Sequence, residues 1–244
     1  MQAIETDKLR NFLGLDEADG TCRLYLPIFD GPSSLNSGIC RGSNLRATPR
    51  KRGFEYLGHT FADRDARSAS YVTSILSCVI GLDNIQWQSV ADFNPGKSGT
   101  VFLFGSRSNK AAKWATRHSA LGKFLRFKFA SKWSIQCSGD KVFSLPAPNR
   151  LTRNEYENTT DYGVIGRFQE TDKGAQTFLI AGLGSRATEG CGYFLANHWK
   201  NLARSFGRRD FAIVLKFAPP VDPKTSEVAV AFDDEHTEGF SPSL

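Results

Sequence analysis

Two segments of the sequence share a glycine turn of a kind that can hold phosphate. Each begins with an apolar run, continues through Gly, Ser and Arg, and passes into a helical pattern; they span Phe102 to Ala115 and Phe178 to Leu195. Glycine lets the backbone approach a ligand, and the unpaired N–H groups at a helix start attract anions. The turns therefore predict an anion site formed by Gly105, Ser106, Arg107, Ser108, Asn109, Gly182, Gly184, Ser185, Arg186 and Thr188.

The chemistry of the paired turns has two interpretations. Arg107 and Arg186 would add charge-assisted hydrogen bonds to a bound phosphate. Glycine after a strand is equally a usual way for an α/β protein to begin a helix without binding anything. Neither turn is a complete nucleotide motif, because Ala187 stands where the third glycine of GxGxxG would be and no GxxxxGK[ST] loop occurs. The sequence leaves both interpretations open.

The two turns, at Gly105 to Asn109 and Gly182 to Glu189, resemble those of Rossmann-like nucleotide-sensing and nucleotide-cleaving domains, as in the TIR and SLOG families. The resemblance covers only these turns. It implies a nucleotide or NAD as ligand or substrate and, in some members, cleavage of an N-glycosidic bond. Cleavage needs a carboxylate that stabilises an oxocarbenium-like transition state. Glu189 is the candidate, although the helix dipole alone favours an acidic residue in a first helical turn.

The elements that would position these residues follow from apolar periodicity. Helices are expected at residues 63–80, 109–116 and 188–206, and strands at 22–29, 84–90, 100–104, 162–168, 177–181 and 211–217. The continuous apolar run Phe211 to Phe217 is typical of a parallel strand that is covered on both faces. We therefore expect a Rossmann-like, mostly parallel sheet with helices on both faces. Ligands bind such sheets outside the carboxyl ends of the strands, where both turns would lie.

The middle of the chain has a different pattern. Residues 123–145 alternate with period two around Ser138-Gly139-Asp140, which predicts an antiparallel hairpin insertion. Between Phe93 and Gly139 the chain carries nine Lys or Arg and no Asp or Glu, with aromatic residues interleaved. These rings either stack on nucleic-acid bases or face the core while the cations face solvent. The basic stretch 97–132 is thus an alternative interaction surface for nucleic acid or protein.

Length and composition predict one α/β domain at residues 21–218, preceded by a segment 1–20 and followed by a polar, acidic tail 219–244. No apolar run approaches the roughly 20 residues of a membrane span, and no signal peptide is evident, so we expect a cytoplasmic protein that does not bind membranes. The net charge of +6 favours an anionic small molecule or nucleic acid as partner. The oligomeric state is left open. Without CxxC or HExxH we expect reduced cysteines and no metal site, and the aperiodic residues 33–60 predict a long loop.

Overall fold

The computed structural model describes residues 2–15, 21–30, 59–61, 63–94, 99–107, 109–147, 151–169 and 176–241. The loop expected at 33–60 lies outside these residues except for its last two positions. Ser108 and Cys40 also lie outside them.

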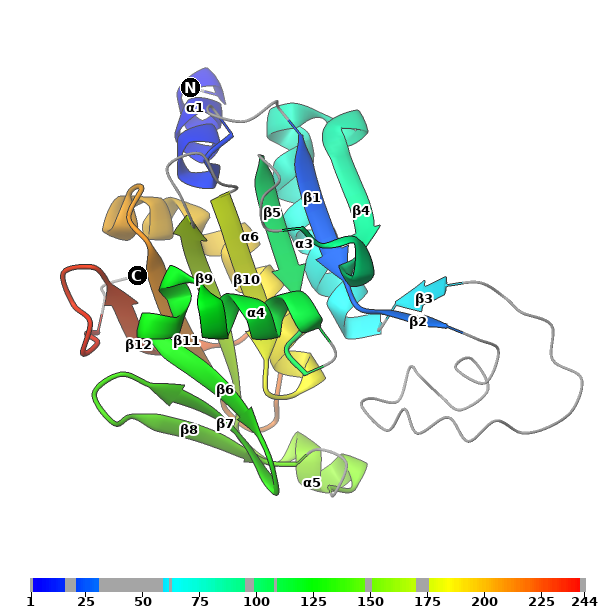
Figure 1. Cartoon of the computed structure of the whole chain (residues 1–244), viewed down its shortest axis with the longest axis vertical. Coiled ribbons are helices and arrows are strands. Elements are labelled where there is room, and N and C mark those ends of the chain that lie inside the picture. The colour runs from blue at the N-terminus through cyan, green and yellow to red at the C-terminus, as the bar shows by residue number, and fades with distance from the viewer. Residues whose placement is uncertain are drawn as a thin grey trace, which may run out of the picture.

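A seven-stranded sheet forms the centre of the structure, in the order β12-β11-β9-β10-β5-β1-β4 (Figure 1). Its strands are β1 (Cys22–Leu26), β4 (Ile85–Ser89), β5 (Thr100–Phe104), β9 (Asp161–Gln169), β10 (Gln176–Gly182), β11 (Phe211–Phe217) and β12 (Glu227–Asp233). The neighbours β4, β1, β5 and β10 are parallel. All five residues of β5 are buried, as a strand inside a two-sided core requires. The strand was predicted to the residue.

The other half of the sheet is antiparallel, so the expected parallel sheet is found only among β4, β1, β5 and β10. β9 pairs antiparallel with both β10 and β11, and β12 pairs antiparallel with β11. The interpretation of Phe211–Phe217 as a parallel strand was wrong about its neighbours, although the strand is buried on both faces. An apolar run indicates that a strand is buried on both faces. The direction of the strand relative to its neighbours depends on the segments that connect them. β10 and β11 still run the same way on either side of β9.

Three helices cover one face of the sheet: α1 (Gln2–Leu13), α3 (Asp63–Ile80) and α6 (Ser185–Phe206). The bounds of α3 agree with the prediction, and α6 begins three residues earlier than predicted. α1 lies in the segment 1–20, which the sequence analysis placed before the α/β domain. Its Leu9, Phe12 and Leu13 are buried in the core of this face. The segment is therefore part of the packed structure.

The opposite face is covered by α4 (Lys110–His118) and by a three-stranded antiparallel sheet of β6 (Leu125–Phe129), β7 (Lys132–Cys137) and β8 (Val142–Pro146) (Figure 1). The predicted antiparallel insertion is confirmed. Phe127, Phe129 and Trp133 pack toward the core, whereas Arg126 and Lys128 are exposed. The aromatic rings of this region thus face the core and the cations face solvent, which is one of the two arrangements weighed from the sequence.

Short elements complete the structure. α5 (Arg153–Glu157) lies before β9, and β2 (Ile28–Asp30) pairs with β3 (His59–Phe61). β12 comes from residues 219–244, which the sequence assigned to a tail, and its last four residues are buried. Among the helices of the described residues, none has the length and apolar character needed to cross a bilayer.

Candidate ligand site at the carboxyl edge of the sheet

The two glycine turns lie side by side because β5 and β10 are parallel neighbours. The Ser106 hydroxyl donates a hydrogen bond of 2.6 Å to the carbonyl oxygen of Gly182. The Gly105 amide donates one of 2.9 Å to the carbonyl oxygen of Ile180. The structure therefore brings together the two halves of the predicted site.

The second turn already holds a carboxylate that belongs to the protein. Asp161, the first residue of β9, accepts hydrogen bonds from the backbone amides of Gly184 at 2.9 Å and Ala187 at 3.3 Å, and from the Tyr156 hydroxyl at 2.8 Å. Burial raises the pKa of Asp161, and these hydrogen bonds act in the opposite direction. An internal anion thus occupies the start of α6, where the sequence predicted a bound phosphate.

The remaining polar groups of the second turn are also used internally. The Gly182 amide donates to the Thr188 hydroxyl at 2.9 Å. Arg186 pairs with Glu157 at 2.7 Å and stacks on the ring of Tyr156, with 5.4 Å from the guanidinium carbon to the ring centroid. Ser185 is half-buried and begins α6. These polar groups form contacts within the protein that stabilise the fold. Arg186 is therefore already paired and is not free to bind a phosphate.

The glycines of the second turn are explained by close packing. A Cβ atom at Gly184 would collide with the Tyr156 hydroxyl and the Asp161 carboxylate, and one at Gly182 would collide with the backbone of Gly184. Glycine is needed at these positions because other parts of the chain approach the backbone closely. These glycines are therefore not evidence of a bound ligand.

The first turn leaves two cations exposed. Asn109 is buried and caps α4: its Oδ1 accepts from the Ala112 amide at 3.0 Å, and its Nδ2 donates to the Phe104 carbonyl at 2.7 Å. Arg107 is exposed, with its guanidinium carbon 5.0 Å from the ring centroid of Trp133, and Lys110 is exposed in the first turn of α4. Of the phosphate contacts predicted in the first turn, Arg107 is exposed, whereas Gly105, Ser106 and Asn109 are buried.

Asp65 also lies at this edge, and the sequence interpretation gave it no role in the site. It lies in the first turn of α3, is only 6% exposed, and burial raises its pKa to about 7. One carboxylate oxygen lies 2.8 Å from where a Cβ atom of Gly105 would be. No residue in the described part of the chain donates a hydrogen bond to it. Asp65 lies four residues before Ala69, on the buried face of α3. This spacing in the sequence could have predicted that Asp65 is buried and is not an exposed helix cap.

Glu189 lies between α3 and α6. It is 4% exposed and forms an ion pair with Arg64, the residue before Asp65. One turn further along α3, the Ser68 hydroxyl donates 2.8 Å to the carbonyl oxygen of Thr188. The same helical turn of α3 therefore supplies the partner of Glu189 and the carboxyl group beside Gly105.

An acidic cluster lies at the end of β12. Asp233, Glu235 and His236 bring their ligand atoms within 4.8 Å of one another. Arg209 pairs with Asp233 at 3.0 Å and with Glu235 at 2.6 Å. Because a guanidinium already neutralises these carboxylates, we interpret the cluster as an ion-pair network. The described cysteines are free thiols.

Comparisons with known protein families, curated protein sequences and solved structures found no significant match to this chain. The resemblance of the glycine turns to TIR and SLOG domains stays a prediction. The geometry of the carboxyl edge is therefore the basis on which a function is proposed.

Proposed function

We propose that this chain binds a nucleotide, or another phosphorylated small molecule, at the carboxyl ends of β1 and β5. The observation that carries the proposal is Asp65, a buried carboxyl group against Gly105 with no hydrogen-bond donor among the described residues. Burying a carboxyl group without a donor is costly, and such groups with shifted pKa values concentrate at functional sites.

The topology around Asp65 supports this location. α3, which follows β1, packs on one face of the sheet, and α4, which follows β5, packs on the other. β1 and β5 are parallel neighbours, so the chain switches faces between them. In open α/β sheets, ligands bind outside the carboxyl ends of the strands at such a switch point.

The side chains at this edge suit the two ends of a nucleotide. Asp65 has a pKa of about 7, so near neutral pH its carboxyl group both donates and accepts hydrogen bonds, as sugar hydroxyls require. Arg107 and Lys110 are exposed cations beside the start of α4, where phosphate would be favoured. Arg186, by contrast, is engaged by Glu157 and has no direct role in the proposal.

The bound ligand would either regulate the protein, as in a sensor, or be cleaved at its N-glycosidic bond. In the second case Glu189 supplies the carboxylate that stabilises positive charge on the sugar. Glu189 forms an ion pair with Arg64 of α3. The same ion pair also ties α3 to α6, so Glu189 has a structural role in either case.

Calorimetric titration with AMP, ADP, ATP, GTP and NAD tests the binding proposal. We expect at least one ligand to bind, and Arg107→Glu/Lys110→Glu to weaken it by about tenfold or more, because two attractive charges become repulsive. Arg126→Glu/Lys128→Glu, which makes the same charge change on β6, is the control. Equal affinity in the wild type and the first variant would show that the phosphate site is wrong.

Incubation with NAD, followed by product analysis, tests cleavage. The expected result is release of nicotinamide by the wild type and loss of that activity in Glu189→Gln, with nucleotide affinity retained. Full activity in Glu189→Gln would exclude its catalytic role. Thermal unfolding of the variant distinguishes loss of chemistry from loss of fold.

A second candidate function rests on the outer face of the β6–β8 sheet. Arg126, Lys128 and Lys132 are exposed there, in a stretch of sequence without carboxylates. Since the aromatic rings face the core, nucleic acid would be held through phosphates alone, without stacking on these rings. Oligonucleotide affinity should then fall steeply with salt and be lost in Arg126→Glu/Lys128→Glu. Absence of binding at low salt would remove this candidate.

A further inference from the structure

A pocket of about 440 Å³ opens between α1 and the C-terminal half of α6. It lies far from the glycine turns. Thr100, which begins β5, donates its hydroxyl to the carbonyl oxygen of Leu13 at the end of α1, so this part of α1 lies at the amino edge of the sheet. The turns follow the opposite ends of β5 and β10. A volume of this size is within the range of small-molecule sites.

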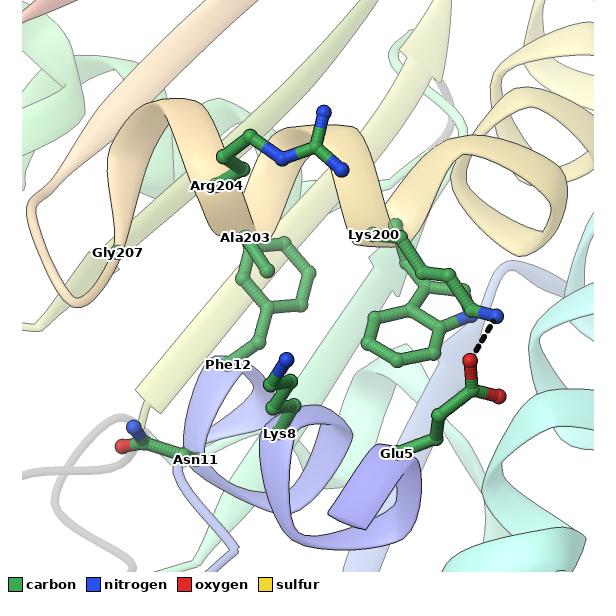
Figure 2. Close-up of a pocket in the computed structure, with 9 residues that line it drawn as sticks. Glu5, Lys8, Asn11, Phe12, Lys200, Ala203, Arg204 and Gly207 are labelled. Carbon is green, nitrogen blue, oxygen red and sulfur yellow. Dashed lines mark hydrogen bonds and ion pairs between the residues drawn. The ribbon is translucent and has the colours of Figure 1, made fainter. Parts of the chain in front are cut away.

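The pocket has an apolar, aromatic side. Phe12 and Ala203 line it, and Figure 2 shows the Phe12 ring pointing from α1 toward α6; Trp199 of α6 also lines the pocket. Phe12 is almost fully buried, whereas Trp199 is half-buried and offers part of its indole to the pocket. A flat apolar group would bury against these rings.

The other groups of the pocket are mostly cationic. Lys8, Lys200 and Arg204 line it with a single carboxylate, Glu5, which leaves a formal charge of +2. Glu5 pairs with Lys200 at 2.6 Å at one end of the pocket (Figure 2). Lys8 and Arg204, from the two facing helices, are the cations that this ion pair leaves to a ligand.

A further positive charge lies beneath the pocket. The Arg167 guanidinium is 1% exposed and donates to the carbonyl oxygens of Phe12 at 2.9 Å and Gly207 at 2.7 Å, two residues that line the pocket. It also stacks on the ring of Phe12. The hydrogen bonds of this side chain within the described residues go to neutral carbonyls. The Asp210 carboxylate interacts with this charge and offsets part of the positive potential that Arg167 adds at the pocket floor.

We propose that the pocket between α1 and α6 binds a small organic anion, an aryl or similarly flat group that carries a carboxylate or phosphate. The acidic group binds between Lys8 and Arg204, and the flat group packs against Trp199 and Phe12. The site is independent of the nucleotide site proposed above, because the two lie at opposite edges of the sheet.

Calorimetric titration with phenyl phosphate tests the site, with inorganic phosphate and phenol as comparison probes. We expect phenyl phosphate to bind with a dissociation constant below about 1 mM and both comparison probes to bind at least tenfold more weakly, since each has only half of the recognised chemistry. Equal affinity for phenyl phosphate and inorganic phosphate, or no phenyl phosphate binding up to about 10 mM, would overturn the proposal.

Four variants locate the binding. Lys8→Gln/Arg204→Gln should weaken phenyl phosphate by about tenfold or more, whereas Lys224→Gln, an exposed cation elsewhere, should leave its affinity unchanged. Trp199→Ala should weaken phenyl phosphate and leave inorganic phosphate unchanged. Glu5→Gln should tighten binding, because it releases Lys200 to the ligand.

The outcomes separate this site from the nucleotide site. Retained phenyl phosphate binding in Arg107→Glu/Lys110→Glu supports a second, distinct site. Unchanged affinity in Lys8→Gln/Arg204→Gln, or weaker affinity in Glu5→Gln, contradicts the proposal. Thermal unfolding of each variant tests whether the fold is retained. We expect it to be, because every substitution at the pocket except Trp199→Ala replaces one polar side chain by another.

Discussion

The Ser106 hydroxyl donates a 2.6 Å hydrogen bond to the carbonyl oxygen of Gly182 and thereby joins the two glycine turns. Ser106 is buried, and Gly182 is buried as well. The bond links two residues that are 76 positions apart. It is a direct contact between the halves of the carboxyl edge, and its contribution to stability can be measured.

Ser106→Ala should lower the free energy of unfolding by about 1–2 kcal/mol, because a buried carbonyl loses its hydroxyl donor. Urea denaturation measures the change. Ser70→Ala is the matched control: its hydroxyl also donates to a carbonyl, that of Ala66, but on an exposed helix surface. A cost for Ser106→Ala no larger than that of the control would mean that the junction contributes little stability.

Gly105→Ala should destabilise the fold for two separable reasons. Gly105 has φ of 81°, which costs a non-glycine residue about 1 kcal/mol, and its new Cβ atom would lie 2.8 Å from an Asp65 carboxylate oxygen. Gly81→Ala is the control, because Gly81 has φ of 77° and open space around it.

A double-mutant cycle isolates the contact. In an Asp65→Ala background, Gly105→Ala should cost less than in the wild type, since only the backbone penalty remains. Strictly additive effects of Gly105→Ala and Asp65→Ala would show that the two residues do not contact each other as described.

The Asp65 carboxyl group should make the stability depend on pH. Burial raises its pKa to about 7 from an ordinary value of 3.8, so between about pH 4 and pH 7 the folded protein holds a proton that the unfolded chain has released. The free energy of unfolding therefore falls as pH rises through this window, by on the order of 2–4 kcal/mol. Above about pH 7 this contribution is constant.

Asp65→Asn should remove this dependence and be more stable than the wild type above pH 7. Denaturant titrations from pH 4 to 8 measure the difference between the two proteins. Asp83→Asn, at an exposed position, controls for the loss of one negative charge. A difference between wild type and Asp65→Asn that does not change with pH would argue against a buried carboxyl group.

The ion pair between Arg64 and Glu189 should respond unequally to removal of its partners. The side chain of Glu189 is 5% exposed and that of Arg64 is 33% exposed. Arg64→Met strands a buried carboxylate and should cost about 2–4 kcal/mol, whereas Glu189→Gln leaves a cation that reaches water and should cost about 1 kcal/mol. Denaturant unfolding gives both values.

Two further variants check this explanation. Arg67→Met removes an exposed pair with Asp63 and should cost less than about 1 kcal/mol. Arg64→Met/Glu189→Gln should recover part of the loss seen in Arg64→Met, because no buried charge is left unpaired. Equal costs for Arg64→Met and Glu189→Gln would contradict the asymmetry in burial.

Elements whose burial has a local period are predictable from the amino-acid sequence. β5 (Thr100–Phe104) and α3 (Asp63–Ile80) were predicted to the residue, because an apolar run or a 3.6-residue spacing records which side chains leave water. The same reasoning identified two strand, glycine turn and helix units. One of the two arrangements considered for the β6–β7 region placed the aromatic rings toward the core and the cations toward solvent. The structure has this arrangement.

The contacts of the glycine turns, by contrast, depend on how strands that are distant in the sequence are arranged. Asp161 reaches the start of α6 because β9 runs antiparallel to β10 and begins at the same edge, a direction that no pattern within β9 encodes. Asp65 lies against Gly105 because α3 packs beside β5. Periodicity in the sequence indicates which residues are buried. Which hydrogen-bond partner a buried residue meets depends on the order and direction of the strands. For this reason the sequence could predict an anion site but not that one turn already holds its own carboxylate.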